Sequence, residues 1–276
     1  MKRLLLVLLM CAPAWGVNLF TGDPNCVGLW TGDSTSDSIY FLDESGNSNH
    51  LNGTGAYFSA SSAQYKEGSY SMRNTNDWYV IERPNATLSA KFPGKSGTTN
   101  RNVSTCCWIY GNINVVAYDW LLAVYDFTGN KQSWSVYIDA SGNVNFGIGY
   151  NGGASFESYA NTGVALGDTK WYHIGTSYNG TTGAVIIRVW DDTGSTVYNA
   201  TTTFSETMNI EDAGFALFGY TTQSNSGHGY EGYMDEVVVF NDVLTTDEID
   251  QIRLGTYGAT AETGTSDWWW RRRHNN

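Results

Sequence analysis

The chain has 276 residues, of which 41% are hydrophobic and 14% aromatic, with 31 Gly and only 4 Pro. This is enough apolar material for a sizeable core, which excludes a chain that is disordered throughout. Acidic residues outnumber basic ones by 27 to 15, and the formal net charge of −12 disfavours nucleic acid and anionic membrane surfaces as partners.

The first residues have the composition of an export signal. Lys2 and Arg3 are followed by an apolar run over 4–10 and by small residues near Ala14, the order found in signal peptides. The run is too short to span a bilayer, so we predict that residues 1–16 are removed and that the protein is secreted or held at a cell surface. Lipidation of Cys11 is disfavoured, because the residue before it is a large methionine.

From residue 27 onward, short segments rich in β-formers are separated by turn residues. Two pairs of these segments flank Gly-containing loops and predict hairpins, and the polar stretch 84–102 is expected to be a long loop. We expect strands at 135–138, 144–148, 172–178, 184–190, 197–201, 215–220 and 233–240. The spacing predicts an all-β antiparallel sandwich or jelly roll rather than βαβ units.

One short helix is expected at the C-terminal end of the sandwich, over 246–254. Thr245 and Glu248 have the spacing of a capping box, and Leu244 and Ile249 are placed for a hydrophobic staple. Gly255 then supplies a stop signal.

The last part of the chain differs in composition from the rest. Residues 259–266 are small and polar, and Trp268-Trp-Trp-Arg-Arg-Arg273 follows. The apolar part is far too short for a membrane span, but indole and guanidinium groups both favour protein interfaces. We therefore predict a single domain over 17–257 and a disordered tail over 258–276 whose role is open, with docking on a partner as one alternative.

Three cysteines remain after removal of the signal, and their pairing is open. Cys106 and Cys107 are neighbours in a predicted strand, so their side chains point to opposite faces. Cys26 could pair with one of them in an oxidising compartment, or all three could be small buried residues.

Four segments carry a resemblance to a known family. They are Val27-Gly-Leu-Trp30 with the loop Asp43-Glu-Ser-Gly-Asn-Ser-Asn49, then Val103-Ser-Thr-Cys-Cys-Trp-Ile109, Trp171-Tyr-His-Ile-Gly-Thr-Ser-Tyr178, and the closing stretch 232–253. In order and spacing they resemble laminin-G-like domains of the concanavalin A-like lectin/glucanase superfamily. The resemblance implies a concanavalin A-like β-sandwich, a fold that hosts lectins, adhesion modules, lyases and hydrolases.

The resemblance also implies a structural Ca²⁺ ion between the N-terminal loop and the closing strand. The residue types suit this ion, which prefers carboxylate, amide and carbonyl oxygens. The expected ligands are Asp43, Asn47, Asn49 and Asp235. The alternative is a loop whose side chains cap their own backbone.

Aromatic and amide side chains of two strands and two loops predict a shallow groove that binds carbohydrate or another polymer, because sugars stack on rings and hydrogen-bond to polar groups. The candidate residues are Trp134, Tyr137, Tyr150, Asn151, Tyr159, His228 and Tyr230. Since side chains alternate along a strand, about half of the strand residues are expected to face the core instead.

Catalytic patterns are not found in the sequence: the Glu-x-Asp-x-Glu spacing of retaining glucanases on this fold is missing. We therefore predict non-catalytic recognition of a glycan or of a cell-surface or extracellular protein. The alternatives are a glycan-degrading enzyme and a structural or adhesive surface protein, for example on a virion.

Overall fold

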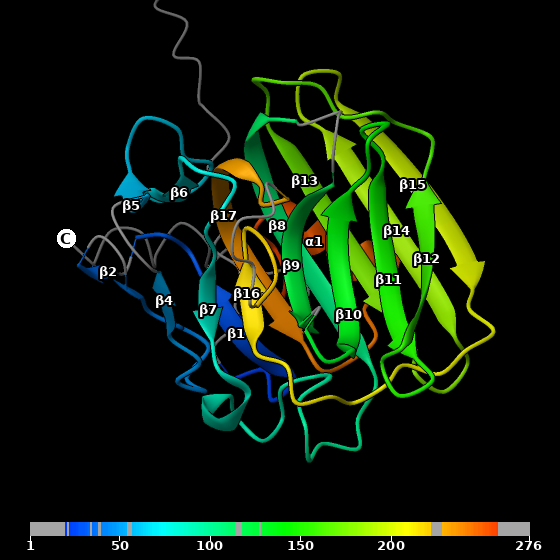
Figure 1. Ribbon diagram of the computed structural model, residues 1–276. Helices are drawn as coiled ribbons and strands as arrows, with labels where there is room; N and C mark the ends of the chain where they lie inside the picture. Colours follow the sequence, from blue (N-terminus) through cyan, green and yellow to red (C-terminus); the bar gives the residue numbers. More distant parts are fainter. Residues whose placement is uncertain are drawn as a thin grey trace, which may run out of the picture.

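The computed structural model describes residues 20–258, apart from 21, 34, 38–39, 54–56, 114–117, 127 and 222–227. The predicted signal over 1–16, Cys11 included, and the predicted tail, apart from Gly258, therefore lie outside the described residues. Within them, two antiparallel sheets pack face to face (Figure 1). The prediction of an all-β sandwich with one short helix is confirmed.

The first sheet contains both ends of the domain. In spatial order its strands are β15 (Thr196–Thr203), β14 (Ala184–Asp191), β13 (Tyr172–Tyr178), β8 (Val103–Asn112), β17 (Glu231–Phe240), β6 (Ser71–Asn74) and β5 (Phe58–Ser61), and β1 (Cys26–Trp30) pairs with the second half of β17. Leu29 lies opposite Val238, so the beginning and the end of the described chain are side by side.

The second sheet faces the viewer in Figure 1. In spatial order its strands are β12 (Ser155–Asn161), β11 (Val144–Tyr150), β10 (Lys131–Ile138), β9 (Asp119–Asp126), β16 (Phe215–Leu217), β7 (Ile81–Arg83), β4 (Leu51–Gly53), β3 (Tyr40–Phe41) and β2 (Thr35–Asp37). The stretch 84–102 contains the 3-10 helix η1 (Asn85–Thr87) and otherwise connects the sheets by turns, as expected.

Alternation along the strands builds the main core between the sheets. In β10, Trp134, Val136 and Ile138 are fully buried there, and so are Val144, Phe146 and Ile148 of β11. The residues between them point to the outer face of the second sheet. Burial of this apolar surface stabilises the fold by roughly 25 cal/mol per Å².

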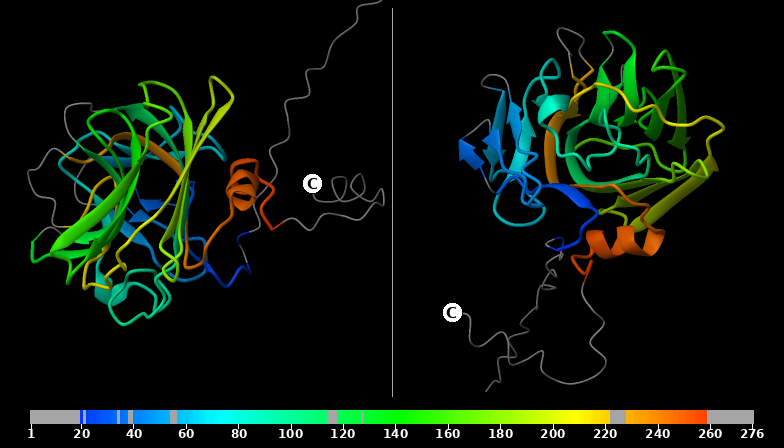
Figure 2. Two further views of the ribbon diagram at one scale, coloured as in Figure 1. Left: turned by 90° about the vertical axis from the view of Figure 1, so that its right-hand side faces the viewer. Right: turned by 90° about the horizontal axis from the view of Figure 1, so that it is seen from below.

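The single α-helix of the described chain, α1 (Thr246–Arg253), lies outside the sandwich against the first sheet (Figure 2). Its predicted capping box is present, and Leu244 and Ile249 pack in one cluster. Gly175 permits this docking, because a Cβ there would lie 2.3 Å from the Ile249 side chain. Gly255 ends the helix at φ +68°, a conformation that glycine adopts readily.

All three cysteines of the domain are free and buried. Cys107 belongs to the main core, whereas Cys106 and Cys26 belong to the cluster beneath α1. The opposite orientations predicted for Cys106 and Cys107 are therefore confirmed. Of the two alternatives for these residues, the structure has the one in which they fill buried space.

Candidate functional site

A row of small side chains crosses the outer face of the second sheet. Ser135 of β10 lies opposite Gly147 of β11 and opposite Ala123 of β9, and Ala123 lies opposite Ala216 of β16. Because directly opposite residues project from the same face of a sheet, these four residues form one continuous floor.

Aromatic rings close over this floor. They come from β9, β10, β12 and the segment after β16, and we call them the outer aromatic cluster: Trp120, Tyr125, Tyr137, Phe156 and Tyr220. Trp120 is central, with its ring centroid 5.0 Å from Tyr137, 4.7 Å from Tyr125 and 5.1 Å from Tyr220. The small floor makes room for the rings: a Cβ on Gly147 would lie 2.3 Å from the Phe156 ring.

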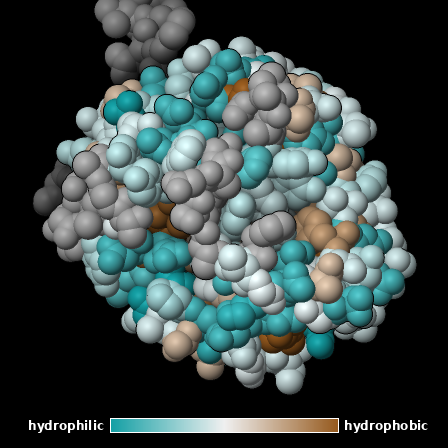
Figure 3. All heavy atoms as spheres, in the orientation of Figure 1, coloured by the Kyte–Doolittle hydropathy of each residue, from teal (hydrophilic) through white to brown (hydrophobic). Residues whose placement is uncertain are grey.

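Some rings support the cluster and others face solvent. Tyr125, Tyr137 and Tyr220 are at most 9% exposed. Trp120 and Phe156 are partly exposed, and Tyr118, which packs edge-on against Tyr137, is 50% exposed. Apart from the residues drawn in grey, Figure 3 shows this face as mostly pale and teal, with only small brown areas.

Buried polar atoms without a partner accompany the cluster. Within the described residues, Ser135 Oγ, Gln132 Oε1 and His228 Nδ1 are buried and accept or donate no hydrogen bond. Ser135 is part of the floor, Gln132 lies opposite Tyr125, and the His228 ring is 6.5 Å from that of Tyr118. Buried polar groups of native proteins are nearly always paired, so this concentration is typical of a site that a ligand or water completes.

The hydroxyls of Tyr125 and Tyr137 in the cluster stay neutral at physiological pH. Burial, with smaller contributions from Tyr220 and Tyr137, raises the pKa of Tyr125 to about 12. Burial is also the main cause of the raised pKa of Tyr137. Neutral phenols can donate and accept hydrogen bonds, so they suit hydroxyl-bearing ligands.

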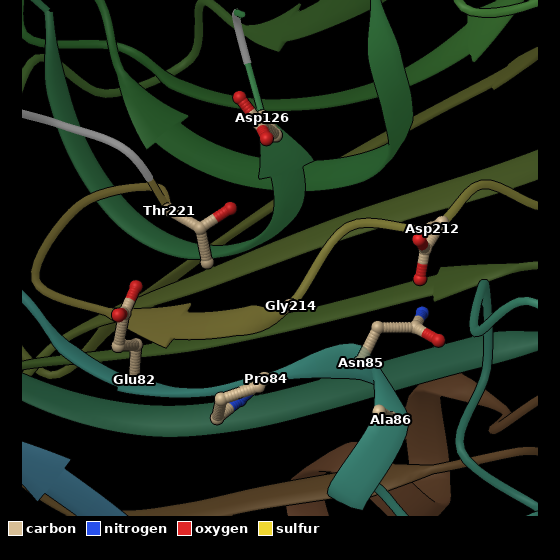
Figure 4. Close-up of a pocket in the computed structure, with 8 residues that line it drawn as sticks. All are labelled: Glu82, Pro84, Asn85, Ala86, Asp126, Asp212, Gly214 and Thr221. Atoms are coloured by element: carbon tan, nitrogen blue, oxygen red, sulfur yellow. The ribbon is translucent and has the colours of Figure 1, made fainter. Parts of the chain in front are cut away.

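An open pocket of about 390 Å³ lies on the same sheet, near the end of β9 (Figure 4). Its lining residues are Glu82, Pro84, Asn85, Ala86, Asp126, Asp212, Gly214 and Thr221. Burial and the negative charge of Asp126 raise the pKa of Glu82. The pocket therefore combines carboxylates with amide and hydroxyl groups.

The structure places the predicted ligand-binding residues in several regions. Tyr137 belongs to the outer aromatic cluster, and His228 lies beside it. Trp134 and Tyr230 require a correction: both are fully buried in the main core and have no surface for a ligand. Alternation explains Trp134, because it shares the inward face of β10 with Val136.

The other three predicted residues lie away from the cluster. Tyr150 and Asn151 mark the end of β11, where Asn151 is an exposed turn residue at φ +55°. Tyr159 packs against the main core from β12 and lines a different surface groove.

The candidate set lacked Tyr118, Trp120, Tyr125 and Tyr220. Bulges in the pairing of β9 with β10 explain part of this, since the register shifts between Gln132 and Trp134 of β10 and again between Leu122 and Trp120 of β9. Simple alternation does not survive such shifts. The signal available in the sequence was the density of aromatic residues over 118–125.

The predicted calcium ligands are occupied by hydrogen bonds. The Asp43 carboxylate accepts bonds from the backbone N–H groups of Leu29, Ser45 and Asn49, at 3.0, 2.9 and 2.7 Å. The side-chain amide of Asn49 donates hydrogen bonds to Val27 O and Ser89 Oγ, and its oxygen accepts one from the N–H of Ser89. The loop is thus closed onto β1 in the self-capping manner.

Asp235 and Asn47 contact other backbone segments. The Asp235 carboxylate accepts bonds from the N–H groups of Lys66, Glu67 and Glu236, whereas Asn47 donates to Cys26 O. Within the described residues, no three His, Cys, Asp or Glu side chains are grouped so that they could hold a metal ion. Because two of the four predicted ligands are asparagines, this finding does not test the predicted site, and calcium stays a prediction.

An acidic region accompanies Asp235. Glu236 sits at a bulge of β17 with φ +49°, a conformation unusual for a residue with a side chain. Burial raises its pKa to about 9, and the charges of Asp235, Glu67, Glu44 and Asp33 add to the effect. Glu236 is therefore mainly protonated at neutral pH.

Comparison with models of known families shows to which family the chain belongs. The model of the family described as "Concanavalin A-like lectin/glucanases superfamily" matches residues 83–250, more than half of the chain. The chain belongs to this superfamily. The match spans the strands from β8 to β17 and thus the outer aromatic cluster. A comparison with curated proteins finds no significant match in sequence.

Solved structures show the same lectin-like fold. A Trypanosoma rangeli sialidase matches with a TM-score of 0.53 and 11% identity, over 83% of this chain and 32% of the sialidase. Botulinum neurotoxin type C gives the same TM-score and identity over 83% of this chain and 51% of the toxin. The chain thus spans about half or less of these two proteins.

A smaller match is a Ruminococcus gnavus sialidase carbohydrate-binding module bound to α2,3-sialyllactose, with a TM-score of 0.43 and 16% identity over 56% of this chain and 82% of the module. At these identities the likeness concerns the fold.

Among the described residues, no helix has the length and apolar character needed to cross a membrane.

Proposed function

We propose that the outer aromatic cluster is a non-catalytic carbohydrate-binding site. The observation that carries this proposal is the set of rings on the solvent face of the second sheet, where Tyr118, Trp120 and Phe156 remain accessible. A separate apolar cluster on an outer sheet face contributes less to stability than the main core does, because part of its surface stays in water. We therefore assign the outer aromatic cluster a role in ligand binding.

The chemistry of the cluster suits a sugar ring. The C–H face of a pyranose packs on an aromatic ring, and its hydroxyls need polar partners at the edge of that ring. Tyr118, which is half exposed, and His228, which is partly exposed, supply polar groups beside the rings. A pyranose lying on Trp120 would meet both requirements at once.

The fold relatives provide separate support. The structure of botulinum neurotoxin type C is named for its interaction with two ganglioside molecules, and another Trypanosoma rangeli sialidase structure contains sialic acid. Glycans are therefore ligands of proteins that share this fold, and we propose the same general class for this chain.

Two further parts of the proposal come from the sequence. We propose that residues 1–16 direct export, which would bring the binding face to extracellular glycans. We also propose the structural calcium ion on the basis of the family resemblance alone. N-terminal sequencing of protein recovered from the medium tests the first, and the chelator experiment described in the Discussion tests the second.

A glycan array tests the proposed function. Wild-type protein and the Trp120→Ala variant are applied to the same array, with Tyr65→Ala as the matched control. Tyr65 is also exposed, at 47%, but belongs to the segment between β5 and β6. We expect wild type and the control to bind the same glycans and Trp120→Ala to lose them. Equal binding by all three proteins would show that the outer aromatic cluster is not the glycan-binding site.

A further inference from the structure

We propose that strand β15 (Thr196–Thr203) pairs with β15 of a second copy of the chain, so that the protein is a two-fold symmetric dimer whose first sheet continues from one copy into the other. This dimer does not depend on the ligand of the outer aromatic cluster. Three features point to it: the protection of the other sheet edges, the backbone groups that β15 leaves free, and the residues of β15 itself.

β15 is a long strand at the edge of its sheet. It has eight residues, it pairs with β14 along its whole length, and no described strand pairs with its other side (Figure 1). Its sequence, Thr-Val-Tyr-Asn-Ala-Thr-Thr-Thr, contains no charged residue and no Pro. Natural proteins protect edge strands by charge, Pro, short length or a covering segment, because a free edge pairs readily with another chain. β15 has none of the first three protections.

The other edges of the two sheets carry such protection. β5 has four residues and β2 has three, so both strands are short. The free edge of β1 is covered by the loop that contains Asp43 and Asn49, whose side chains bond to the β1 backbone. In β12, the charged residue Glu157 accepts bonds from the N–H groups of the segment that follows β15. Among the described strands, β15 is thus the long unprotected edge.

The backbone groups that β15 leaves free follow from two hydrogen bonds. Phe204 N–H donates to Gly183 O at 2.9 Å and continues the ladder between β14 and β15. Asn179 N–H donates to Ala184 O at 2.9 Å, which turns this carbonyl towards β13. Because bonded residues alternate along an antiparallel pair, both bonds direct the even-numbered residues of β15 towards β14. The residues whose N–H and C=O groups point away from β14 are Val197, Asn199, Thr201 and Thr203. Within the described chain, no hydrogen bond reaches these backbone groups.

The sequence of β15 suits pairing with its own copy. An axis beside Ala200 places Asn199 opposite the partner's Thr201 and Val197 opposite the partner's Thr203, so all four residues with free backbone groups gain a bonded neighbour. Ala200 then lies opposite its own copy, where a small side chain avoids a clash. Because β15 has no charge, no like charges meet near the axis. A second copy of the chain therefore satisfies the whole edge.

The edge of β15 is accessible from the open side of the sandwich. An open groove of about 480 Å³ lies between β15 and the end of β12, and residues 197–201 form one side of it. Tyr159 and Asn161 of β12 lie on the other side. The second sheet therefore does not close over β15, and a neighbouring strand has room beside it.

The dimer has a consequence for binding. Directly opposite residues of an antiparallel pair project from the same face of a sheet, so the two-fold axis is perpendicular to the first sheet. The second sheets of both copies then lie on the same side, and so do the two outer aromatic clusters. With the proposed function, the dimer presents two glycan-binding faces to one surface. Bivalent binding raises the apparent affinity for surfaces that carry many glycan copies.

Size-exclusion chromatography with light scattering tests the dimer on the full chain. Wild type should have twice the mass of one chain. Thr201→Lys places a charge beside the axis in each copy and should weaken the dimer Kd at least about 10-fold. The matched control is Thr75→Lys, because Thr75 is exposed and follows β6 near the opposite edge of the first sheet. This control should remain a dimer.

Thr201→Pro removes a single backbone donor. Its N–H points away from β14, so proline should leave the ladder of the chain itself in place and remove bonds to the second copy. We expect a monomer with the circular dichroism spectrum of wild type. Thr201→Lys tests the same edge without a change of backbone.

Ala200→Cys tests the register. The two copies of residue 200 form a non-hydrogen-bonded pair with Cα atoms about 4.5 Å apart, a distance that a disulfide spans. Mild oxidation should give a covalent dimer of Ala200→Cys on a non-reducing gel and none of Thr75→Cys. The cysteines of the domain are buried, so they do not compete.

The outcomes separate this dimer from the proposed function. A wild type that stays monomeric at the highest concentration measured overturns the dimer. A dimer that Thr201→Lys leaves unchanged, or that Ala200→Cys does not cross-link, overturns the assignment to β15. Monomeric Thr201→Lys should bind a soluble glycan with the Kd of wild type but a glycan-coated surface more weakly. A dimer without any array hits supports the pairing of β15 and overturns the proposed function.

Discussion

Trp120 stacks on Tyr137 with ring centroids 5.0 Å apart and planes inclined by 25°, on the solvent face of the second sheet. Trp120 is partly exposed, whereas Tyr137 is 7% exposed and fixes its position. The pair is thus a preformed platform. Preformed contact surfaces bind with a smaller loss of side-chain entropy.

Removal of an exposed ring should weaken glycan binding without unfolding the protein. For Tyr118→Ala we expect a 5- to 30-fold loss of affinity, corresponding to about 1–2 kcal/mol, because one stacking surface disappears. The melting temperature should change little, since half of this ring is exposed. Calorimetry and thermal melting measure the two effects. A large fall in Tm would instead assign Tyr118 a structural role.

Two glycine substitutions in β11 should have different effects: one should weaken ligand binding by moving a ring, and the other should reduce stability by a clash with the backbone. In Gly147→Ala, the new Cβ meets the partly exposed Phe156 ring, which can move, so binding should weaken while stability is nearly kept. In Gly149→Ala, the new Cβ would lie 2.0 Å from Gln132 O, which is backbone. We expect this variant to lose about 1–3 kcal/mol of stability. Denaturant titration of both variants checks the contrast.

The protonation of Glu236 predicts a pH dependence of stability. The pKa of its carboxyl is raised in the folded state to about 9, above its ordinary value of 4.5, mainly by burial. The folded protein therefore binds more protons than the unfolded chain between these values, and this contribution to stability falls as pH rises from about 5 to 9. Asp235, with a pKa of about 7, acts in the same direction.

Glu236→Gln isolates this effect. An uncharged side chain of the same size should stabilise the protein at about pH 8 by roughly 1–3 kcal/mol and reduce the pH dependence. Denaturant titrations at several pH values give the comparison. An unchanged pH profile in the variant would show that Glu236 is not the titrating group.

The sequence-based prediction of calcium requires a stability that depends on the ion. If calcium binds through Asp235, chelator should lower the Tm of wild type, calcium should restore it, and Asp235→Asn should not respond. An identical Tm in chelator and in calcium would show that no calcium ion stabilises the fold. The hydrogen bonds of Asp43 and Asp235 to backbone N–H groups would then account for the closure of the two loops.

Local patterns predicted much of the fold. The capping box at Thr245 and Glu248 and the hairpins of β10–β11 and β13–β14 depend on short-range geometry, which the sequence displays directly. The resemblance in the closing segment placed β17 beside β1. These features are decided by neighbours in the chain or by a family pattern.

The binding face was harder to predict, because it depends on register between strands. Trp134 and Tyr137 are three residues apart in β10, so alternation places one in the main core and the other on the outer face. In β9, however, the neighbours Leu121 and Leu122 both belong to the main core, because a bulge shifts the alternation there, and Trp120 is brought to the outer face. The partners Phe156 and Tyr220 come from distant segments, and only the folded structure brings them to Trp120.

Calorimetric titration of the strongest glycan from the array into wild type, Trp120→Ala and Tyr65→Ala tests the central claim most directly. We expect saturable binding by wild type and Tyr65→Ala with the same Kd, and at least a 30-fold weaker Kd for Trp120→Ala, corresponding to about 2 kcal/mol. An unchanged Kd in a folded Trp120→Ala variant would contradict the assignment of the outer aromatic cluster as the binding site.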